Sequence, residues 1–405
     1  MEQAFTGLLV RYNISEKSTS GRSTCEDELH VNLWEIGKPF IDIGLMINQW
    51  KKEIDSVELV LPWVLGKLDI YDLASSINNE LCIGAIFNET AQYKGRANNR
   101  FSEITLIKHD ENNSDKNKNN TFELLTLSSD DFLVEERITS DGDKYSVVTI
   151  KLPNIDSINP TSSTASDEAD SKEISDRLYM RFRIIKIPSA FYQSKFNQAD
   201  SNILSSYKTT RIIDFRINVR RGVPKELLIA KSTSVFPSLK KIHFFLTIDR
   251  SQECIFRGQN FIGCRSLTDE EVWNHYVNSH SACDISTRDS VKNYLGYQWS
   301  TSNEKTVVKD LIALGRFSNT ESSTMQILRF ITLGLVFGMA GNGLWELAME
   351  DCNELFLYKL RVILCIVGVG LAIIFVSHLL RWKKICYNSI LDKIINFVDR
   401  LKIKN

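Results

Sequence analysis

The chain contains 405 residues, of which 24% are charged and 43% are hydrophobic, and its formal net charge at pH 7 is -1. This balance excludes a protein whose whole surface attracts nucleic acid, so any site for an anion has to be local. At this length the chain has room for one large domain or for two ordinary domains, with further residues to spare.

Short runs rich in Val, Ile, Phe and Tyr recur between polar turns along residues 1–320. Such runs predict β-strands, and many short strands with few helices are typical of two packed antiparallel sheets. We therefore expect a mainly β region that forms an antiparallel β-sandwich. The predicted strands are Phe5–Tyr12, Val31–Ile47, Ser56–Trp63, Leu81–Phe87, Phe101–Ile107, Tyr145–Leu152, Leu178–Ile187, Arg211–Arg220, Lys241–Asp249, Cys254–Arg257 and Tyr294–Trp299.

Two polar segments predict loops. Lys108–Asn120 is almost entirely polar, and Asp156–Glu173 is rich in Ser, Thr and Asp without an apolar face. The second segment is either a linker that divides residues 1–320 into two subdomains near 156–173, or a long loop inside one sandwich.

Three segments of the same region are expected to depart from the strand pattern. Asp69–Asn78 is a candidate helix, and Thr268–His280 is a better one, because Thr268 and Glu271 have the spacing of a capping box. Thr306–Phe317 is expected to be a helix or an extension that leads from the sandwich to the segments that follow it.

Two long apolar segments near the C-terminus predict a helical hairpin over residues 325–381. Ile327–Ala348 and Val362–Leu380 are each long enough, at about 1.5 Å per residue, to cross the ~30 Å hydrocarbon core of a bilayer. A spanning segment has to pair all its backbone N–H and C=O groups internally, which favours a helix. We therefore expect a transmembrane hairpin that ties a large polar region to a membrane.

The distribution of basic residues predicts the orientation of this hairpin. Lys and Arg are concentrated after the second span, whereas Glu350, Asp351 and Glu354 lie in the connection between the spans. The positive-inside rule then places both termini in the cytoplasm, and the N-terminus has no signal-peptide pattern. The tail, residues 382–405, is amphipathic and is expected to form a helix that either lies on the membrane or pairs as a short coiled coil.

The search for catalytic and metal-binding motifs gives no candidate. The chain has no phosphate-binding loop ending in Lys-Ser/Thr, no Gly-x-Ser-x-Gly and no His-Glu-x-x-His, so we expect neither enzymatic activity nor a cofactor. Zinc-type ligands cluster within thirty residues, but their spacing fits no compact zinc finger, so we expect unrelated residues, and the eight cysteines are expected to be thiols. These ligands are Cys254, Cys264, His275, His280 and Cys283.

Two basic strands provide a candidate ligand site. Arg181 and Arg183 alternate with apolar residues in one strand, and Arg216 and Arg220 do so in another. Because side chains alternate between the two faces of a strand, the arginines of each strand share a face, and their guanidinium groups suit phosphate oxygens. The simpler interpretation is a solvated sheet face with acidic partners.

The first apolar segment carries residues that could line a pore. Asn342 and Glu346 lie four residues apart and so on one helical face, and Gly334, Gly338 and Gly341 would allow helices to approach closely. If several subunits assemble, Asn342 and Glu346 could surround a water-filled path, as acidic rings do in cation channels. Alternatively, Glu346 marks the outer membrane interface.

The segment VNLWEIGKPFIDIGLMI (Val31–Ile47), the many-stranded body and the C-terminal hairpin together resemble bacterial membrane effectors of anti-phage defence, in particular the Hailong type. The resemblance implies a homo-oligomeric channel in the bacterial inner membrane. It also implies a cytoplasmic β sensor for an oligonucleotide signal that a partner nucleotidyltransferase makes. Duplex nucleic acid is not an expected partner. The alternative is a membrane-anchored scaffold that binds a protein and conducts nothing. A third possibility is an enzyme whose site none of these motifs marks.

Overall fold

The computed structural model describes residues 4–14, 27–50, 54–95, 100–107, 120–153, 175–197, 207–228, 234–237, 239–278, 290–302, 308–321, 324–348, 357–365 and 367–368. The side chains of residues 196–197, 207–208, 302, 320–321, 324–329 and 346–348 are outside this description. The chain divides into two compact units. Unit 1 comprises Met1–Phe196 with Thr210–Asn319, and unit 2 comprises Asn197–Thr209 with Thr320–Asn405.

The prediction of a mainly β fold is confirmed, and the described strands form three sheets. The first sheet has five strands, all paired antiparallel. In spatial order they are β14 (Ser234–Val235), β1 (Leu9–Ile14), β4 (Ile54–Leu61), β10 (Lys144–Lys151) and β9 (Phe132–Ile138).

The second sheet is the largest and lies at the centre of unit 1. In spatial order its strands are β17 (Phe261–Ser266), β18 (Tyr294–Ser302), β15 (Leu239–Asp249), β2 (Asp27–Trp34), β3 (Phe40–Asn48), β11 (Arg177–Ile184), β8 (Asn120–Leu125), β7 (Phe101–Ile107) and β6 (Thr90–Gly95), with β5 (Ile70–Asp72) also paired to β11. Most neighbours are antiparallel, but β2 pairs with β15, and β8 with β11, in parallel. The prediction of purely antiparallel sheets is therefore wrong at these two pairs.

The third sheet has four strands. Their order is β12 (Gln193–Asn197), β13 (Tyr207–Ile217), β19 (Leu311–Glu321) and β16 (Glu253–Arg257). The described helices are short apart from one. They are α2 (Glu80–Phe87), α3 (Lys225–Leu228), α4 (Glu270–Val277), α5 (Thr324–Ala348), and the 3-10 turns η1 (Lys67–Asp69), η2 (Ala74–Ile77), η3 (Ser129–Asp131), η5 (Ser189–Phe191) and η6 (Val291–Asn293).

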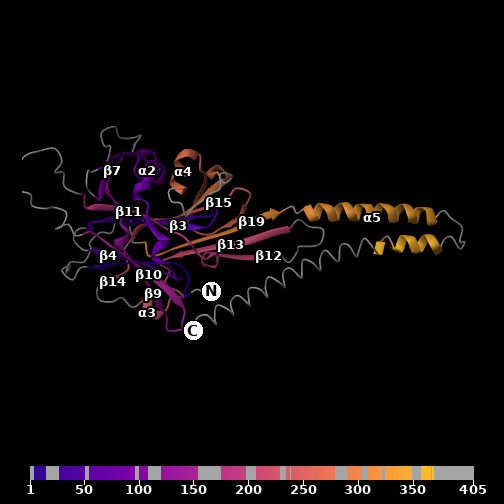
Figure 1. The fold of residues 1–405 in the computed structure, drawn as a ribbon, viewed down its shortest axis with the longest axis horizontal. Helices are drawn as coiled ribbons and strands as arrows, with labels where there is room; N and C mark the ends of the chain where they lie inside the picture. The colour runs from indigo at the N-terminus through magenta and orange to yellow at the C-terminus, as the bar shows by residue number, and fades with distance from the viewer. Residues whose placement is uncertain are drawn as a thin grey trace, which may run out of the picture. The chain divides into compact units, whose positions relative to one another are not determined.

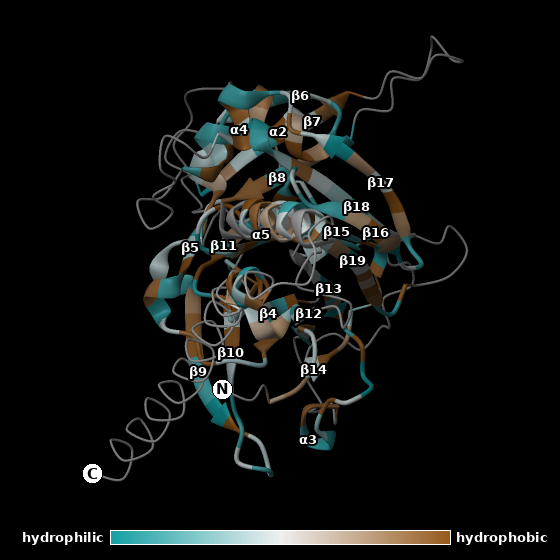
Figure 2. Ribbon diagram, turned by 90° about the vertical axis from the view of Figure 1, so that its right-hand side faces the viewer, coloured by the Kyte–Doolittle hydropathy of each residue, from teal (hydrophilic) through white to brown (hydrophobic). Residues whose placement is uncertain are grey.

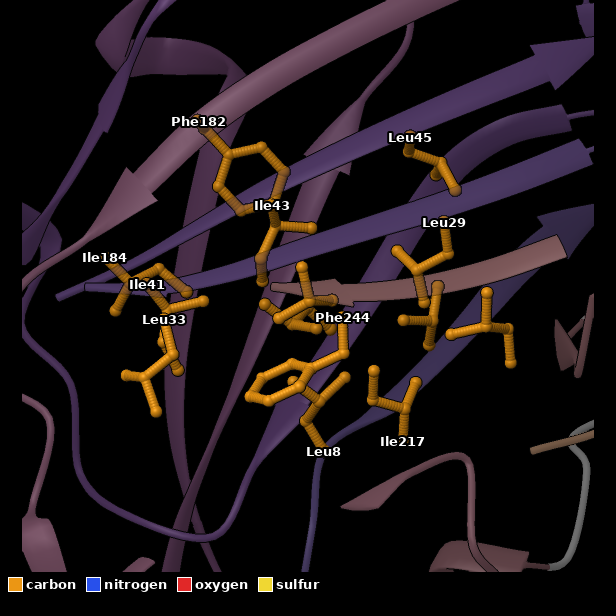
Figure 3. Packing of buried hydrophobic residues seen from close by; sticks show 14 of the residues in the cluster. Leu8, Leu29, Leu33, Ile41, Ile43, Leu45, Phe182, Ile184, Ile217 and Phe244 are labelled. Atoms are coloured by element: carbon orange, nitrogen blue, oxygen red, sulfur yellow. The ribbon is translucent and has the colours of Figure 1, made fainter. Parts of the chain in front are cut away.

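The central sheet is covered on both faces. On one face it packs against the other two sheets, as the sandwich prediction expects, and Figure 3 shows Ile43, Phe182 and Phe244 of this sheet meeting Leu8 and Ile217 from outside it. On the opposite face α2 and α4 cover the sheet, away from β4 and β10 in both Figures 1 and 2. Unit 1 therefore has three layers, with helices forming the third.

The burial of each strand follows from this layering. Strand β3 (FIDIGLMIN) is buried at eight successive positions, which is typical of a strand covered on both faces. Strand β2 (DELHVNLW) instead alternates, so that Leu29 and Val31 enter the sandwich core. Its intervening residues Glu28, His30 and Asn32 lie on the helix-covered face and are only partly buried there.

Several predicted elements differ from those of the structure. The predicted strand Val31–Ile47 is two strands, β2 and β3, joined by a turn in which Gly37 has a φ of +63°. The predicted strand Leu81–Phe87 is helix α2, because Asn79 accepts a hydrogen bond from the Cys82 amide at 2.8 Å and caps the first turn. The apolar run alone did not distinguish the two structures.

The helix predictions are only partly correct. Asp69–Asn78 contains strand β5 followed by the 3-10 turn η2 rather than one helix. Thr268–His280 contains α4, whose N-cap residue is Asp269, without the expected side-chain cap. The segment Thr306–Phe317, expected as a helix or extension, contributes to β19, where Phe317 pairs with Cys254 of β16. Pairing with a distant strand outweighs local sequence preference there.

Unit 2 contains the long helix α5 and a second helical segment at residues 357–365. Ala340 of α5 packs with Ile363, Leu360 and Val367 from the second segment. Among the described residues, no helix is both long enough and apolar enough to cross a membrane. Most of the second predicted span, the whole of the 382–405 tail and the Asp156–Glu173 loop lie outside the described residues, as does Lys108–Asn120 except for Asn120 itself, which begins β8.

Candidate functional site

The helix-covered face of the central sheet contains a cavity of about 590 Å³. Its floor is formed by residues of β2, β11, β15, β17 and β18, and its sides by the end of α2 and by Trp273 of α4. Polar and charged groups predominate among the residues that line it. They include Glu28, His30, Asn32, Arg177, Arg181, Lys241, His243, Arg265 and Gln298.

The parallel pairing of β2 with β15 brings the polar residues of the floor together. In this register Glu28 lies beside Lys241, and His30 lies beside His243. Because side chains alternate along a strand, these four residues share the face that α2 and α4 cover. A shift of one residue in either strand would turn its polar set into the sandwich core.

Four cations surround the cavity without direct carboxylate partners. Among the described residues, Arg177, Arg181, Lys241 and Arg265 form no ion pair within 4.0 Å. Arg181 is fully buried, and Arg177, Lys241 and Arg265 are half-buried. A cation without a carboxylate partner in a partly dry cavity favours the binding of an anion there.

Arg181 is the most buried of these cations, with no exposed surface. Its Nε donates to the Tyr276 hydroxyl at 2.7 Å, and one Nη donates to the Tyr179 hydroxyl at 2.9 Å. The other Nη lies 2.9 Å from the Asn32 amide when the amide oxygen faces it. All three partners are neutral groups, so the positive charge itself is not neutralised by direct contact.

Gly44 leaves the space that the Arg181 side chain occupies. It lies opposite Arg181 in the β3–β11 register. A Cβ at Gly44 would overlap the Tyr179 hydroxyl and would approach a guanidinium nitrogen of Arg181 to 3.0 Å. The absence of a side chain at Gly44 is therefore a structural requirement of the cavity floor.

The two histidines of the floor are neutral at pH 7. Burial, followed by the nearby charges of Lys241 and Arg265, lowers the pKa of His243 well below its usual value. Burial likewise lowers the pKa of His30, although the Glu28 carboxylate, 3.5 Å from its Nε2, opposes the shift. Their ring centroids lie 6.1 Å apart in an edge-to-face arrangement.

Glu28 remains ionised beside these histidines. Burial alone raises its pKa, but the hydrogen bond with His30 and the charges of Lys241 and Arg177 together lower the pKa below its usual value. The cavity thus offers one ionised acceptor within a predominantly cationic lining. Glu89, which has interactions of its own, is the other carboxylate of the lining.

Aromatic rings form the apolar part of the lining. Phe87 from α2, Phe245 from β15 and Trp273 from α4 face the cavity. The Arg265 guanidinium carbon lies 5.2 Å from the centroid of Phe245 and 5.9 Å from that of Trp273. Burial lowers the pKa of Arg265 without changing its charge at pH 7. Rings and cations in one cavity suit a ligand that has both a flat apolar part and an anionic part.

A second groove, of about 1020 Å³, adjoins the cavity between α2 and α4. The two share Asn88, Glu89, Arg265 and Trp273 in their linings. The groove is acidic on its own side, where Glu80, Asp269, Glu270 and Glu271 line it.

The structure does not bring the four predicted arginines together. Arg181 lines the cavity, but Arg183 lies fully buried under α4, where it binds Asp42 through two bonds of 2.6 and 3.0 Å. The expectation of a solvated face for this strand is therefore wrong, because α4 covers it. Arg216 and Arg220 belong to β13 and the turn after it, outside the central sheet.

These last two arginines have local partners. Arg216 forms an ion pair with Asp214 two residues earlier on the same strand, at 2.7 and 3.0 Å. The Arg220 guanidinium carbon lies 4.6 Å from the Phe236 ring centroid. For Arg216 the simpler interpretation of the sequence, a polar sheet face with an acidic partner, is the one that the geometry fits.

The candidate pore residues lie on α5. Asn342 is exposed, and Glu346 belongs to the helix although its side chain lies outside the described set. A Cβ at Gly334, Gly338 or Gly341 would meet nothing within 4 Å, so these glycines leave open space. The close approach within the described hairpin is at a different glycine, Gly343, where a Cβ would lie 2.8 Å from Ile363 Cγ1.

The zinc-type ligands noted in the sequence form no metal site among the described residues. No group of three or more His, Cys, Asp or Glu side chains there is placed to hold an ion. Cys254, Cys264 and His275 lie on three separate elements, β16, β17 and α4. His280 and Cys283 lie outside the described residues.

Sequence reasoning identified Arg181 but not the residues with which it shares the cavity. The pattern of β2 could have indicated a polar site, because Glu28, His30 and Asn32 occupy one face of a strand whose other face is strongly apolar. Their convergence with Lys241 and Arg265 depends on the order of strands in the sheet, which local patterns do not give. The sequence matches no protein-family model, and no curated protein is significantly similar to it.

Proposed function

We propose that unit 1 is a non-enzymatic receptor for a phosphate-bearing, nucleotide-type ligand that binds in the cavity between α2 and α4. The observation that carries the proposal is the set of four cations, Arg177, Arg181, Lys241 and Arg265, without ion-pair partners within 4.0 Å among the described residues. Phosphate oxygens would supply the missing negative charge through charge-assisted hydrogen bonds.

The rest of the lining suits the other parts of such a ligand. The half-buried ring of Phe87 offers an apolar surface against which a heterocycle can pack, and the amides of Asn32 and Gln298 can donate and accept at its edge. The volume of about 590 Å³ is within the range of small-molecule sites, ~300–1,000 Å³.

We further propose that ligand binding controls an oligomeric pore formed by the C-terminal hairpin, as in a bacterial anti-phage effector. Support comes from the apolar segments Ile327–Ala348 and Val362–Leu380, from the resemblance of the chain's layout to effectors of the Hailong type, and from the large apolar side chains that α5 exposes. A helix with exposed apolar residues on several sides needs a lipid or protein environment.

The alternative function is a membrane-anchored scaffold in which the hairpin conducts nothing. Such a scaffold would either keep the same ligand site or bind a protein partner through the exposed surface of unit 1. The two functions differ in assembly, because a single hairpin cannot enclose a path for ions. The mass of the detergent-solubilised particle and its conductance in a planar bilayer distinguish them.

The receptor proposal is tested by calorimetry on the full-length protein in detergent, with a panel of mono- and oligonucleotides. The double variant Arg177→Ala/Lys241→Ala removes two partly exposed cations of the lining, so we expect folding to be retained and affinity to fall at least tenfold. Each charged hydrogen bond contributes about 1.5–3 kcal/mol.

Arg216→Ala is the matched control, because it removes an arginine that is paired outside the cavity. Its affinity should equal that of the unmodified protein. Equal losses in the control and in the double variant would contradict a site in this cavity, as would the absence of binding to every phosphate-bearing compound of the panel.

A further inference from the structure

Helix α4 takes part in both the cavity and the packing beneath it. Trp273 of this helix lines the cavity. Three residues later, Tyr276 is buried against the sheet, with its ring centroid 5.8 Å from that of Trp34. A helix of eight residues therefore contributes one side chain to the lining of the cavity and another to the polar packing on the sheet, three residues apart.

A buried polar network ties Tyr276 to the floor of the cavity. Arg181 donates to the Tyr276 hydroxyl at 2.7 Å, and that hydroxyl donates to Asp42 Oδ2 at 2.7 Å. Asp42 in turn accepts two bonds from Arg183. We refer to Arg181, Tyr276, Asp42 and Arg183 as the α4 anchor.

The last residue of the anchor also binds the end of the helix. Arg183 donates to the carbonyl of Val277 at 2.8 Å and to that of Tyr276 at 3.4 Å. These carbonyls belong to the last turn of α4, where backbone acceptors lack intrahelical partners. A cation at this end also interacts favourably with the helix dipole. The C-terminal turn of α4 is therefore fixed by the sheet rather than by the helix itself.

The charges of the anchor do not balance. Arg181 and Arg183 contribute two positive charges, Asp42 contributes one negative charge, and all three side chains are fully buried. An uncompensated buried charge is strongly unfavourable. The excess charge resides at Arg181, whose direct partners are neutral and whose side chain also lines the cavity. A ligand anion at that position would complete the charge balance of the anchor.

We propose that an anion bound at Arg181 tightens the α4 anchor and so holds α4 closed over the cavity, with the Tyr276 hydroxyl as the link between ligand and helix. This inference rests on the proposed receptor function and assigns its conformational response. Ligand binds better when α4 is anchored, so it shifts the helix toward that state. By thermodynamic reciprocity, weakening the anchor lowers ligand affinity.

The experiment measures amide hydrogen exchange of the full-length protein in detergent, with inorganic phosphate as the probe and sodium chloride at equal ionic strength as the reference. In the unmodified protein, phosphate should slow exchange of residues 270–277 at least fivefold. Residues 80–87 of α2, of which Ile86 and Phe87 line the same cavity, should slow by less than twofold. This internal comparison does not depend on any variant.

Tyr276→Phe then removes the hydroxyl while the ring still fills its place beside Trp34. We expect phosphate to bind with an affinity reduced less than tenfold, but to slow the exchange of α4 by less than twofold. Tyr192→Phe is the control, because it also removes a buried tyrosine hydroxyl. This hydroxyl donates to Glu35 at 2.9 Å, and neither residue lines the cavity. The α4 response of this control should equal that of the unmodified protein.

The outcomes separate the two levels of inference. Phosphate that shows no calorimetric binding to the unmodified protein would overturn the inference, whereas the receptor function is decided separately by the nucleotide panel. Binding that leaves α4 exchange unchanged, or that slows α2 and α4 equally, would overturn the inference and leave the receptor function intact. Full retention of the α4 response in Tyr276→Phe would overturn the role of the hydroxyl.

Discussion

Gly44 shows how one residue without a side chain can determine a charged cavity. Gly44→Ala places a methyl group against the Tyr179 hydroxyl and 3.0 Å from an Arg181 nitrogen. We expect the free energy of unfolding to fall by about 1–3 kcal/mol, as for other overpacked sites, and phosphate binding to weaken. Urea unfolding followed by circular dichroism measures the first effect, and calorimetry the second.

Gly263→Ala provides the matched control for this prediction. Gly263 also lies in a strand of the central sheet, β17, but a Cβ there would meet nothing within 4 Å. Its stability and phosphate affinity should stay within about 0.5 kcal/mol of those of the unmodified protein. If both variants behave alike, the requirement at position 44 is not steric.

Asp72 gives a pH-dependent prediction. Burial raises its pKa to about 7, against the opposing effect of neighbouring backbone N–H groups, and its Oδ1 has no hydrogen-bond partner among the described residues. An unfolded aspartate loses its proton near pH ~4, so the folded chain binds more protons between about pH 4 and 7. This stabilising contribution is complete below that range and is lost as the pH rises through 7.

Asp72→Asn should therefore raise the free energy of unfolding at pH 8 by about 2 kcal/mol and change it little at pH 4.5. The amide oxygen can still accept the Ala74 N–H bond that Asp72 accepts at 3.0 Å. Urea unfolding at the two pH values tests this difference. A gain of equal size at both would show that the burial of a charge is not its cause.

At the scale of elements, the sequence predicted most strands of unit 1 but not their order in the three sheets. Alternation in β2 and the continuous apolar run of β3 follow from which faces are covered, and both are visible in the sequence. The segment Leu81–Phe87 could not be assigned, because a short apolar run fits either a buried strand or a helix. Its capping residue, Asn79, was the available signal.

The site itself was predictable only in part for a related reason. Arg181 was identified because two arginines alternate with apolar residues in β11. The face that they occupy was misjudged, because α4 lies about ninety residues further along the chain and nothing local links it to β11. His30, His243 and Arg265 reach the cavity only through the strand order of the central sheet, which depends on long-range pairing.

The glycines of α5 lead to a prediction about this element. Gly338→Leu adds a side chain where a Cβ meets nothing within 4 Å, so the isolated hairpin tolerates it. If copies of α5 pack closely at this position, the substitution should reduce the mass of the detergent-solubilised particle. Gly343→Leu should instead disturb packing against Ile363 within one chain.

Light scattering of the purified particle measures the mass of both variants. An unchanged mass for Gly338→Leu would place the contacts between subunits elsewhere, for example in the 382–405 tail. A loss of mass in Gly343→Leu alone would indicate that assembly requires an intact hairpin rather than the open glycine face.

At the scale of the whole molecule, the proposed function requires a ligand event in unit 1 to alter ion flow through unit 2. The two elements are close in sequence, because strand β19 ends at Glu321 and α5 begins at Thr324. A strand of an ordered sheet, followed almost directly by a helix, transmits a displacement more effectively than a long linker does. The proposal therefore depends on whether α5 lines a conducting path.

Glu346 provides the test of that path. It follows Asn342 by four residues in α5, so the two share a helical face. If several copies direct this face at a common aqueous path, their carboxylates form a ring of negative charge that attracts cations. Glu346→Gln should then lower cation conductance or cation selectivity in planar bilayers, and Glu346→Lys should do so more strongly. Insertion should be normal for Glu346→Gln, because the length of the apolar segment is unchanged.

Glu354→Gln is the control for the loss of one carboxylate, because Glu354 lies in the connection between the two apolar segments rather than within them. Its conductance should equal that of the unmodified protein at high salt, where charges outside the path are screened. Unchanged currents in both Glu346 variants would place this residue at the interface rather than in a pore. An unmodified protein that carries no current, with or without a phosphate-bearing ligand, would favour the scaffold, in which α5 anchors the receptor and the ligand response stays within unit 1.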